Sequence, residues 1–141
     1  MQGATSAYNK DIKYGRIVEP DATFSKLTKE WNELPFVFSK NGKRFAVSDN
    51  AKRVAVYDAA VGKEICVFGG VRGRAISLSP RGTYLVVWTK YDKSVGPNLI
   101  IYDVGAKKEC ARLFQKDYSH RGWPSLRWTD DETIAATLAQ N

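Results

Sequence analysis

The stretch FSKNGKRFAV, residues 38–47, contains a Ser-x-x-Gly turn that returns forty residues later in LSPRG, residues 78–82. Two further pairs of residues repeat at a spacing of forty-five: Tyr-Asp at 57–58 and 102–103, and Lys-Glu at 63–64 and 108–109. A third copy begins with LRWTDDE, residues 126–132. Repeats of 40–45 residues, each with four short strands, are typical of propeller blades.

Short β-branched and aromatic runs between turn residues give the expected strands. They lie at 36–38, 44–48, 53–57 and 64–68 in the first copy, at 75–78, 84–89, 98–102 and 109–113 in the second, and at 125–128 and 133–138 in the third. Asn41-Gly42 and Arg81-Gly82 tolerate the positive φ of tight turns. Asp58 and Asp103 are placed to bond the backbone of the next turn.

The sequence therefore predicts an all-β fold, a WD-repeat-like β-propeller fragment of about two and a half four-stranded antiparallel blades. The blades are expected at about 36–70, 75–115 and 125–141, the last of them incomplete. Because such an array cannot close a ring, we expect the chain to be part of a larger protein. We also expect it to be aggregation-prone or partly ordered in isolation. The alternative is a small self-contained β-sandwich with repeated hairpins.

Residues 1–35 form a separate N-terminal segment. Phe24, Leu27, Trp31 and Leu34 recur with helical spacing before Pro35, which predicts a short helix over 24–34. The segment carries five Lys/Arg and five Asp/Glu, whereas residues 36–141 carry seventeen against ten. The whole excess of the chain, +7 over 141 residues, therefore lies in the repeats.

Several stretches of the repeats resemble eukaryotic translation initiation factor 2A over about residues 36–141. They are FSKNGKRFAV (38–47), GPNLIIYDVGAKKEC (96–110), LFQKD (113–117) and WPSLRWTDDET (123–133). The resemblance implies an N-terminal β-propeller and an association with the small ribosomal subunit, its ribosomal RNA, initiator tRNA and mRNA. It also implies the remaining propeller blades of the parent chain as partners. Trp123-Pro124 lacks the Cys that the family places between these residues, and Lys107 occupies the turn position that Gly62 fills in the first copy.

Composition and charge narrow the function classes. A basic chain favours a polyanionic partner. The apolar runs are far below the roughly 20 residues that span a bilayer, and residues 1–10 contain no signal-peptide core. With two cysteines and one histidine, no zinc-binding spacing exists, so we expect no metal, no cofactor, no membrane and a cytoplasmic chain with free thiols.

No constellation of catalytic residues emerges, so we expect no enzyme and propose no catalytic residue. His120 is the one imidazole and lies in a polar loop, Asp130-Asp131-Glu132 falls in a turn, and the Gly-rich run 69–74 lacks the P-loop pattern. Cys66 and Cys110 fall on equivalent strands and are expected to be small core residues. Strand aromatics are expected to form the core between blades: Phe36, Phe38, Tyr57, Phe68, Tyr84, Trp88, Tyr102 and Trp128.

Alternating strand direction sorts the loops into two faces. Residues 48–53, 69–74, 90–97 and 115–124 share one face and hold eight Lys/Arg against three Asp. The loops of the other face hold seven Lys/Arg and seven Asp/Glu. Tyr91, Tyr118, His120 and Trp123 are expected to be available for stacking on the basic face. The predicted RNA- or ribosome-binding residues are Lys52, Arg53, Arg72, Arg74, Lys90, Tyr91, Lys93, Lys116, Tyr118, His120 and Arg121.

The function expected from these features is that of a translation initiation factor fragment, a non-catalytic surface that associates with the small ribosomal subunit. It would help initiator tRNA and mRNA engage, through phosphate contacts rather than base readout. The alternative is a generic WD-type propeller scaffold that binds protein partners. Strong salt dependence of RNA binding favours the first, and salt-insensitive peptide binding favours the second.

Overall fold

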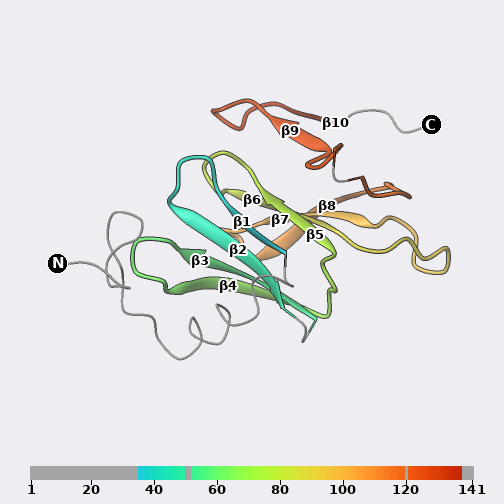
Figure 1. Cartoon of the computed structure of the whole chain (residues 1–141), viewed down its shortest axis with the longest axis horizontal. Helices are drawn as coiled ribbons and strands as arrows, with labels where there is room; N and C mark the ends of the chain where they lie inside the picture. The colour runs from blue at the N-terminus through green and yellow to red at the C-terminus, as the bar shows by residue number, and fades with distance from the viewer. Residues whose placement is uncertain (1–34, 50–51, 120, 138–141) are drawn as a thin grey trace.

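The computed structural model describes residues 35–49, 52–119 and 121–137, and every regular element in these ranges is a strand. The strands form two four-stranded antiparallel sheets and a two-stranded hairpin (Figure 1). The first sheet contains β1 (Phe36–Phe38), β2 (Arg44–Asp49), β3 (Arg53–Asp58) and β4 (Glu64–Gly69). The second contains β5 (Ala75–Leu78), β6 (Tyr84–Trp88), β7 (Leu99–Asp103) and β8 (Lys108–Leu113), and the hairpin contains β9 (Leu126–Trp128) and β10 (Ala135–Thr137).

Each sheet is built from strands in sequence order, joined by hairpins, as expected of a propeller blade. The predicted strands are confirmed to within one or two residues at either end. Both four-stranded sheets also carry an irregularity at the same place, between Val56 and Tyr57 and between Ile101 and Tyr102. This shared bulge supports the forty-five-residue repeat. The predicted helix over 24–34 lies outside the described residues.

The turns between the first two strands of each repeat have one geometry. In all three, a Ser or Thr amide bonds the carbonyl five residues on, at Ser39, Ser79 and Thr129. Three residues after each of them, a residue with positive φ closes the turn: Gly42 at 73°, Gly82 at 76° and Glu132 at 62°. The Asp58 and Asp103 carboxylates accept backbone N–H groups in the following turns, as predicted.

Two apolar layers hold the sheets together. Between the first and second sheets lie the buried side chains of Val54, Val56, Leu85 and Val87, with Phe68 stacked on Tyr102 at 4.1 Å between ring centres. Between the second sheet and the hairpin, Trp88 and Leu99 pack with Leu126, and Tyr84 stacks on Trp128 at 4.9 Å. Because alternate residues of the central strands enter different layers, both faces of the second sheet are buried.

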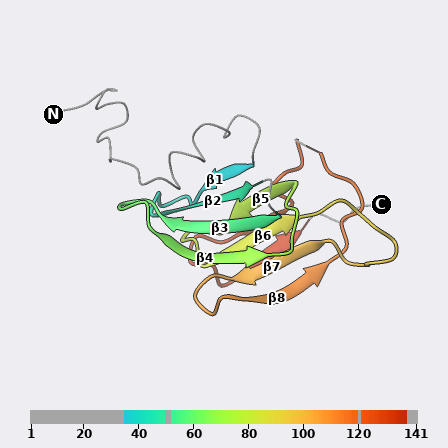
Figure 2. The ribbon, with the colours of Figure 1, turned by 90° about the horizontal axis from the view of Figure 1, so that it is seen from below.

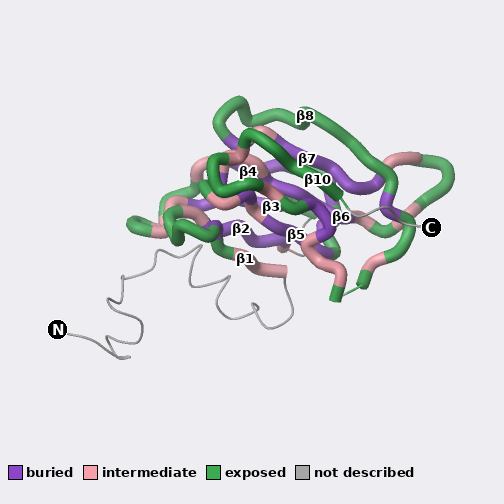
Figure 3. Tube along the Cα trace, turned by 90° about the horizontal axis from the view of Figure 1, so that it is seen from above, coloured by how far each residue is buried: buried purple, intermediate pink, exposed green. Residues whose placement is uncertain are grey.

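Two expectations about the core are wrong. Phe38 is 55% exposed because the short strand β1 ends there, although its ring centre lies 5.3 Å from that of Phe36 and 5.7 Å from that of Phe45. Cys66 is buried as expected, but Cys110 is exposed because every residue of β8, the outer strand of its sheet, is exposed (Figure 3). Burial raises the pKa of the Cys66 thiol. The pKa of Cys110 is also raised, by the limited desolvation that remains on the exposed strand and by the nearby Asp103 carboxylate.

Candidate binding surface

Antiparallel pairing gives the sheets two chemically different ends. At the turn end lie residues 39–44, 58–64, 79–83, 103–109 and 129–132, and at the loop end lie residues 48–53, 69–74, 90–97 and 115–124. In Figure 2 the strand arrows run from one of these ends to the other. The names turn end and loop end are kept for them, and residues 50, 51 and 120 lie outside the described residues.

Some of the charged side chains at the turn end form contacts between repeats. Lys40 pairs with Asp130 at 2.7 Å, and the Arg44 guanidinium donates to the Gly82 carbonyl at 2.8 Å. Glu132 accepts the Arg81 amide at 3.0 Å and the Thr83 hydroxyl. Two carboxylates of the turn at 130–132, those of Asp130 and Glu132, therefore join the third repeat to the first two.

At the loop end the cations are exposed and mostly free of carboxylate partners. The predicted binding residues found exposed there are Lys52, Arg53, Arg72, Arg74, Lys90, Lys93, Lys116 and Arg121. Arg53 pairs with Asp49 at 3.0 Å, and its pKa is raised, first by the hydrogen bond that it donates to Asp49. No other ion pair within the described ranges involves this group of cations.

The predicted aromatic residues of the loop end divide into two sets. Tyr91 is half-buried, and the Lys116 ammonium lies 5.9 Å from its ring centre. Tyr118 packs between Trp88 and Trp123, and the indole N–H of Trp123 donates to the Ile76 carbonyl at 2.9 Å. Tyr118 and Trp123 thus complete the core between repeats, which corrects the expectation that both are available for stacking. His120 lies outside the described residues.

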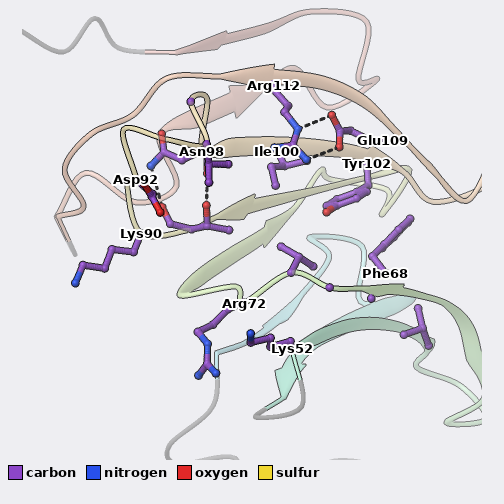
Figure 4. Close-up of a pocket in the computed structure, with 17 residues that line it drawn as sticks. Lys52, Phe68, Arg72, Lys90, Asp92, Asn98, Ile100, Tyr102, Glu109 and Arg112 are labelled. Atoms are coloured by element: carbon purple, nitrogen blue, oxygen red, sulfur yellow. Dashed lines mark hydrogen bonds and ion pairs between the residues drawn. The ribbon is translucent and has the colours of Figure 1, made fainter.

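A pocket of about 710 Å³ opens at the loop end between the first two repeats (Figure 4). It brings together Lys52, Arg72 and Lys90 from three different loops, which sequence reasoning had placed on one face. Its walls include residues that sequence reasoning missed, among them Ile100, Tyr102, Glu109 and Arg112. Their strands were predicted, but the pocket exists only where β4 and β7 of neighbouring repeats face each other.

The long loop at 90–97 is held in place by a small polar network. The side-chain NH2 group of Asn98 donates to the backbone carbonyls of Thr89 and Gln115, at 2.8 and 2.7 Å. Its side-chain oxygen accepts the backbone N–H of Gln115 at 3.0 Å. At the tip, the Asp92 carboxylate accepts the backbone N–H and the hydroxyl of Ser94, which lowers the pKa of Asp92. These hydrogen bonds fix the conformation of the loop that forms one side of the pocket.

Two searches of the described residues bear on other functions. No group of three or more His, Cys, Asp or Glu side chains in these ranges is arranged to hold a metal ion. The same ranges contain no helix of the length and apolar character that a membrane crossing needs.

The sequence relatives of the chain carry the name of one initiation factor. No protein-family profile matches the chain. It is 37% identical over 111 residues to eukaryotic translation initiation factor 2A of Drosophila melanogaster, and 33% identical over 69 residues to the factor of the same name from Dictyostelium discoideum. These matches cover 72% and 47% of this chain but 17% and 11% of those proteins, so the chain spans a small part of their length.

A solved structure described as a crystal structure of the eukaryotic initiation factor superposes on 74% of this chain and 26% of its own, with a TM-score of 0.63 and 27% identity. The two sequence relatives carry the same name in two organisms. The chain is thus similar in sequence to part of eukaryotic translation initiation factor 2A, and in fold to part of a eukaryotic initiation factor.

Proposed function

We propose that the chain supplies a non-catalytic surface of a translation initiation factor, and that its loop end contacts RNA on the small ribosomal subunit. Initiator tRNA and mRNA engagement is the step that this surface would assist. The proposal also assigns the three repeats, at about 36–70, 75–115 and 125–141, to a partial propeller completed by other blades.

The observation that carries the proposal is the difference between the two ends. At the loop end, Arg72, Arg74 and Lys93 are exposed with no ion pair within the described ranges. At the turn end seven Lys/Arg lie among seven Asp/Glu, whereas the loop end holds eight Lys/Arg against three Asp, so the excess positive charge lies at the loop end. Excess cations on one side of a protein are the usual contacts of a phosphate backbone, and such contacts position the RNA without reading its sequence.

A paired charge reversal tests the proposal. Arg72→Glu with Arg74→Glu changes the loop end, and Lys107→Glu with Lys108→Glu makes the same change in net charge at the turn end, where both lysines are exposed. We expect the loop-end pair to weaken binding to the small subunit at least tenfold. It should also flatten the salt dependence, by about one unit of slope for each phosphate that the protein no longer neutralises. Equal weakening by the turn-end pair would contradict the assignment.

A protein-binding scaffold is the second candidate, and the pocket between the first two repeats favours it. A pocket of about 710 Å³ is within the range that small ligands and side chains occupy. Binding of a partner through it would depend weakly on salt if apolar contacts dominated. A salt titration of small-subunit binding therefore separates contact with RNA from a protein partner that is held by apolar contacts alone.

A further inference from the structure

The lining of the pocket between the first two repeats mixes polar residues with four aliphatic ones, Val67, Val71, Val95 and Ile100. Val71 and Ile100 are buried members of the same core cluster, and Val95, on the 90–97 loop, is 66% exposed. The two rings of the lining, Phe68 and Tyr102, stack on each other at 4.1 Å and are both at least nine-tenths buried. Proteins that hold unpaired bases stack them on open ring faces. This pocket is better matched to an aliphatic side chain.

Three cations surround this pocket. The side chains of Lys52, Arg72 and Lys90 lie around the opening (Figure 4). All three are exposed, and none forms an ion pair within the part of the chain that the structure describes. The Lys52 carbonyl accepts the Val71 amide at 3.2 Å, which joins the backbones of two lining residues from different loops.

The two carboxylates of the pocket are already engaged. Glu109 forms two hydrogen bonds with the Arg112 guanidinium, at 2.6 and 2.9 Å. Asp92 accepts the amide and the hydroxyl of Ser94, at 2.9 and 2.7 Å. Arg112 balances the charge of Glu109, whereas the neutral Ser94 leaves Asp92 ionised. The lining therefore holds four Lys/Arg against two carboxylates, a net positive charge that an anionic ligand complements.

We propose that this pocket binds an acidic peptide segment of a partner protein, with one aliphatic side chain against Val71, Ile100 and Val95. Aspartate or glutamate side chains on either side of that residue contact Lys52, Arg72 and Lys90. The proposal goes beyond RNA binding at the loop end and does not depend on it. Because the two ligands share three cations, they would compete for this part of the surface.

The direct test uses three fluorescent ten-residue peptides and the full 141-residue chain. The first peptide is made of aspartates and glutamates with a central leucine, the second replaces the leucine with alanine, and the third replaces the acids with their amides. We expect the first peptide to bind, and each of the other two to bind with an affinity lower by about tenfold or more. Equal affinity of the leucine and alanine peptides would overturn the proposal, since charge alone would then explain binding.

A matched pair of variants locates the site. Val95→Asp places a carboxylate at the mouth of the pocket, and Val61→Asp makes the same change at the turn end, where Val61 is 65% exposed. Both valines are exposed, so folding should persist, and thermal melting checks it. We expect Val95→Asp to weaken the leucine peptide at least tenfold and Val61→Asp less than twofold. Equal effects would overturn the proposal.

An oligouridine of ten nucleotides separates the peptide from RNA. We expect the Arg72→Glu and Arg74→Glu pair to weaken its binding, and Val95→Asp to weaken it no more than Val61→Asp does. If Val95→Asp selectively weakens the oligouridine and leaves the leucine peptide unchanged, the pocket belongs to RNA and the peptide proposal fails. If the unaltered chain binds the leucine peptide but does not bind the oligouridine, only the proposed function in RNA binding fails.

Discussion

Lys107 has a left-handed backbone conformation that lowers the free energy of unfolding. Its φ is 57°, in the turn position where the first repeat has Gly62 with a φ of 69°. A side chain in this left-handed region costs about 1–2 kcal/mol, whereas glycine adopts it freely but loses more chain entropy on folding. We therefore expect Lys107→Gly to raise the free energy of unfolding by about 1 kcal/mol, which is about 2–4 °C in melting temperature.

The reverse change at the equivalent position serves as the control. Gly62 has nothing within 4 Å of an added Cβ, so Gly62→Lys introduces backbone strain without a steric clash. We expect this variant to lose a similar free energy of unfolding, measured by chemical denaturation. Opposite signs for the two variants support the equivalence of the turns, and equal signs would contradict it.

Glu132 links the stability of the third repeat to pH. Burial acts to raise the pKa of its carboxyl, but hydrogen bonds from Ser79, Thr83 and the Arg81 amide outweigh it and hold the pKa below its ordinary value of 4.5. Because the folded pKa is lowered, this stabilisation is present above pH 4.5 and is lost as the pH falls through the folded pKa.

The variant Glu132→Gln should therefore be less stable than the parent chain at neutral pH, by about 1 kcal/mol. The difference should shrink in acid, as protonation removes the same charge from the parent. Thermal melts between pH 3 and pH 7 measure it, with the exposed Glu64→Gln as the control. A difference that stays constant over this range would show that the charge of Glu132 is not involved.

At the scale of elements, the linker between the first two sheets needs glycine at one position. A Cβ on Gly73 would lie 2.9 Å from the Ser48 hydroxyl oxygen and 3.1 Å from a methyl group of Val87, while the same hydroxyl donates to the Gly73 carbonyl at 2.7 Å. We expect Gly73→Ala to cost about 1–3 kcal/mol of unfolding free energy. Gly69→Ala, which has nothing within 4 Å, should cost far less in the same denaturation experiment.

The strands were predictable because each turn carries its own signal. Ser39, Ser79 and Thr129 begin equivalent turns, and Asp58 and Asp103 bond the following ones, so local chemistry set the strand limits. The exposure of Cys110 was not predictable in this way. It depends on β8 being the outer strand with no neighbour on its far side among the described residues, and the periodicity of β8 alone cannot show this.

At the scale of the whole molecule, the Phe68–Tyr102 stack joins the first sheet to the second. Both rings are buried in the shared layer, so Phe68→Ala leaves a cavity between the sheets. We expect it to cost about 3–5 kcal/mol of unfolding free energy, measured by denaturant titration. The exposed Phe38→Ala should cost much less. Comparable destabilisation by the two variants would mean that the stack does not hold the sheets together.

The candidate binding surface was predictable in part. Strand alternation correctly placed Lys52, Arg72 and Lys90 at one end of the sheets, because loop position follows from strand direction. The pocket walls were not predictable, because Ile100 and Val71 meet only when two repeats pack. The hydrogen bond from the Trp123 indole to the Ile76 carbonyl was likewise not predictable, because it forms only when the segment before β9 packs against the second sheet.

The first two sheets are fastened to each other at both of their ends. At the turn end the Asn41 amide donates to the Pro80 carbonyl, and the Arg44 guanidinium donates to the Gly82 carbonyl. At the loop end the chain itself connects the sheets through residues 69–74, and the Ser48 hydroxyl donates to the Gly73 carbonyl within that linker. A rotation that parts the two sheets at either end would break contacts there, so the space between them is held at a set width before any occupant arrives.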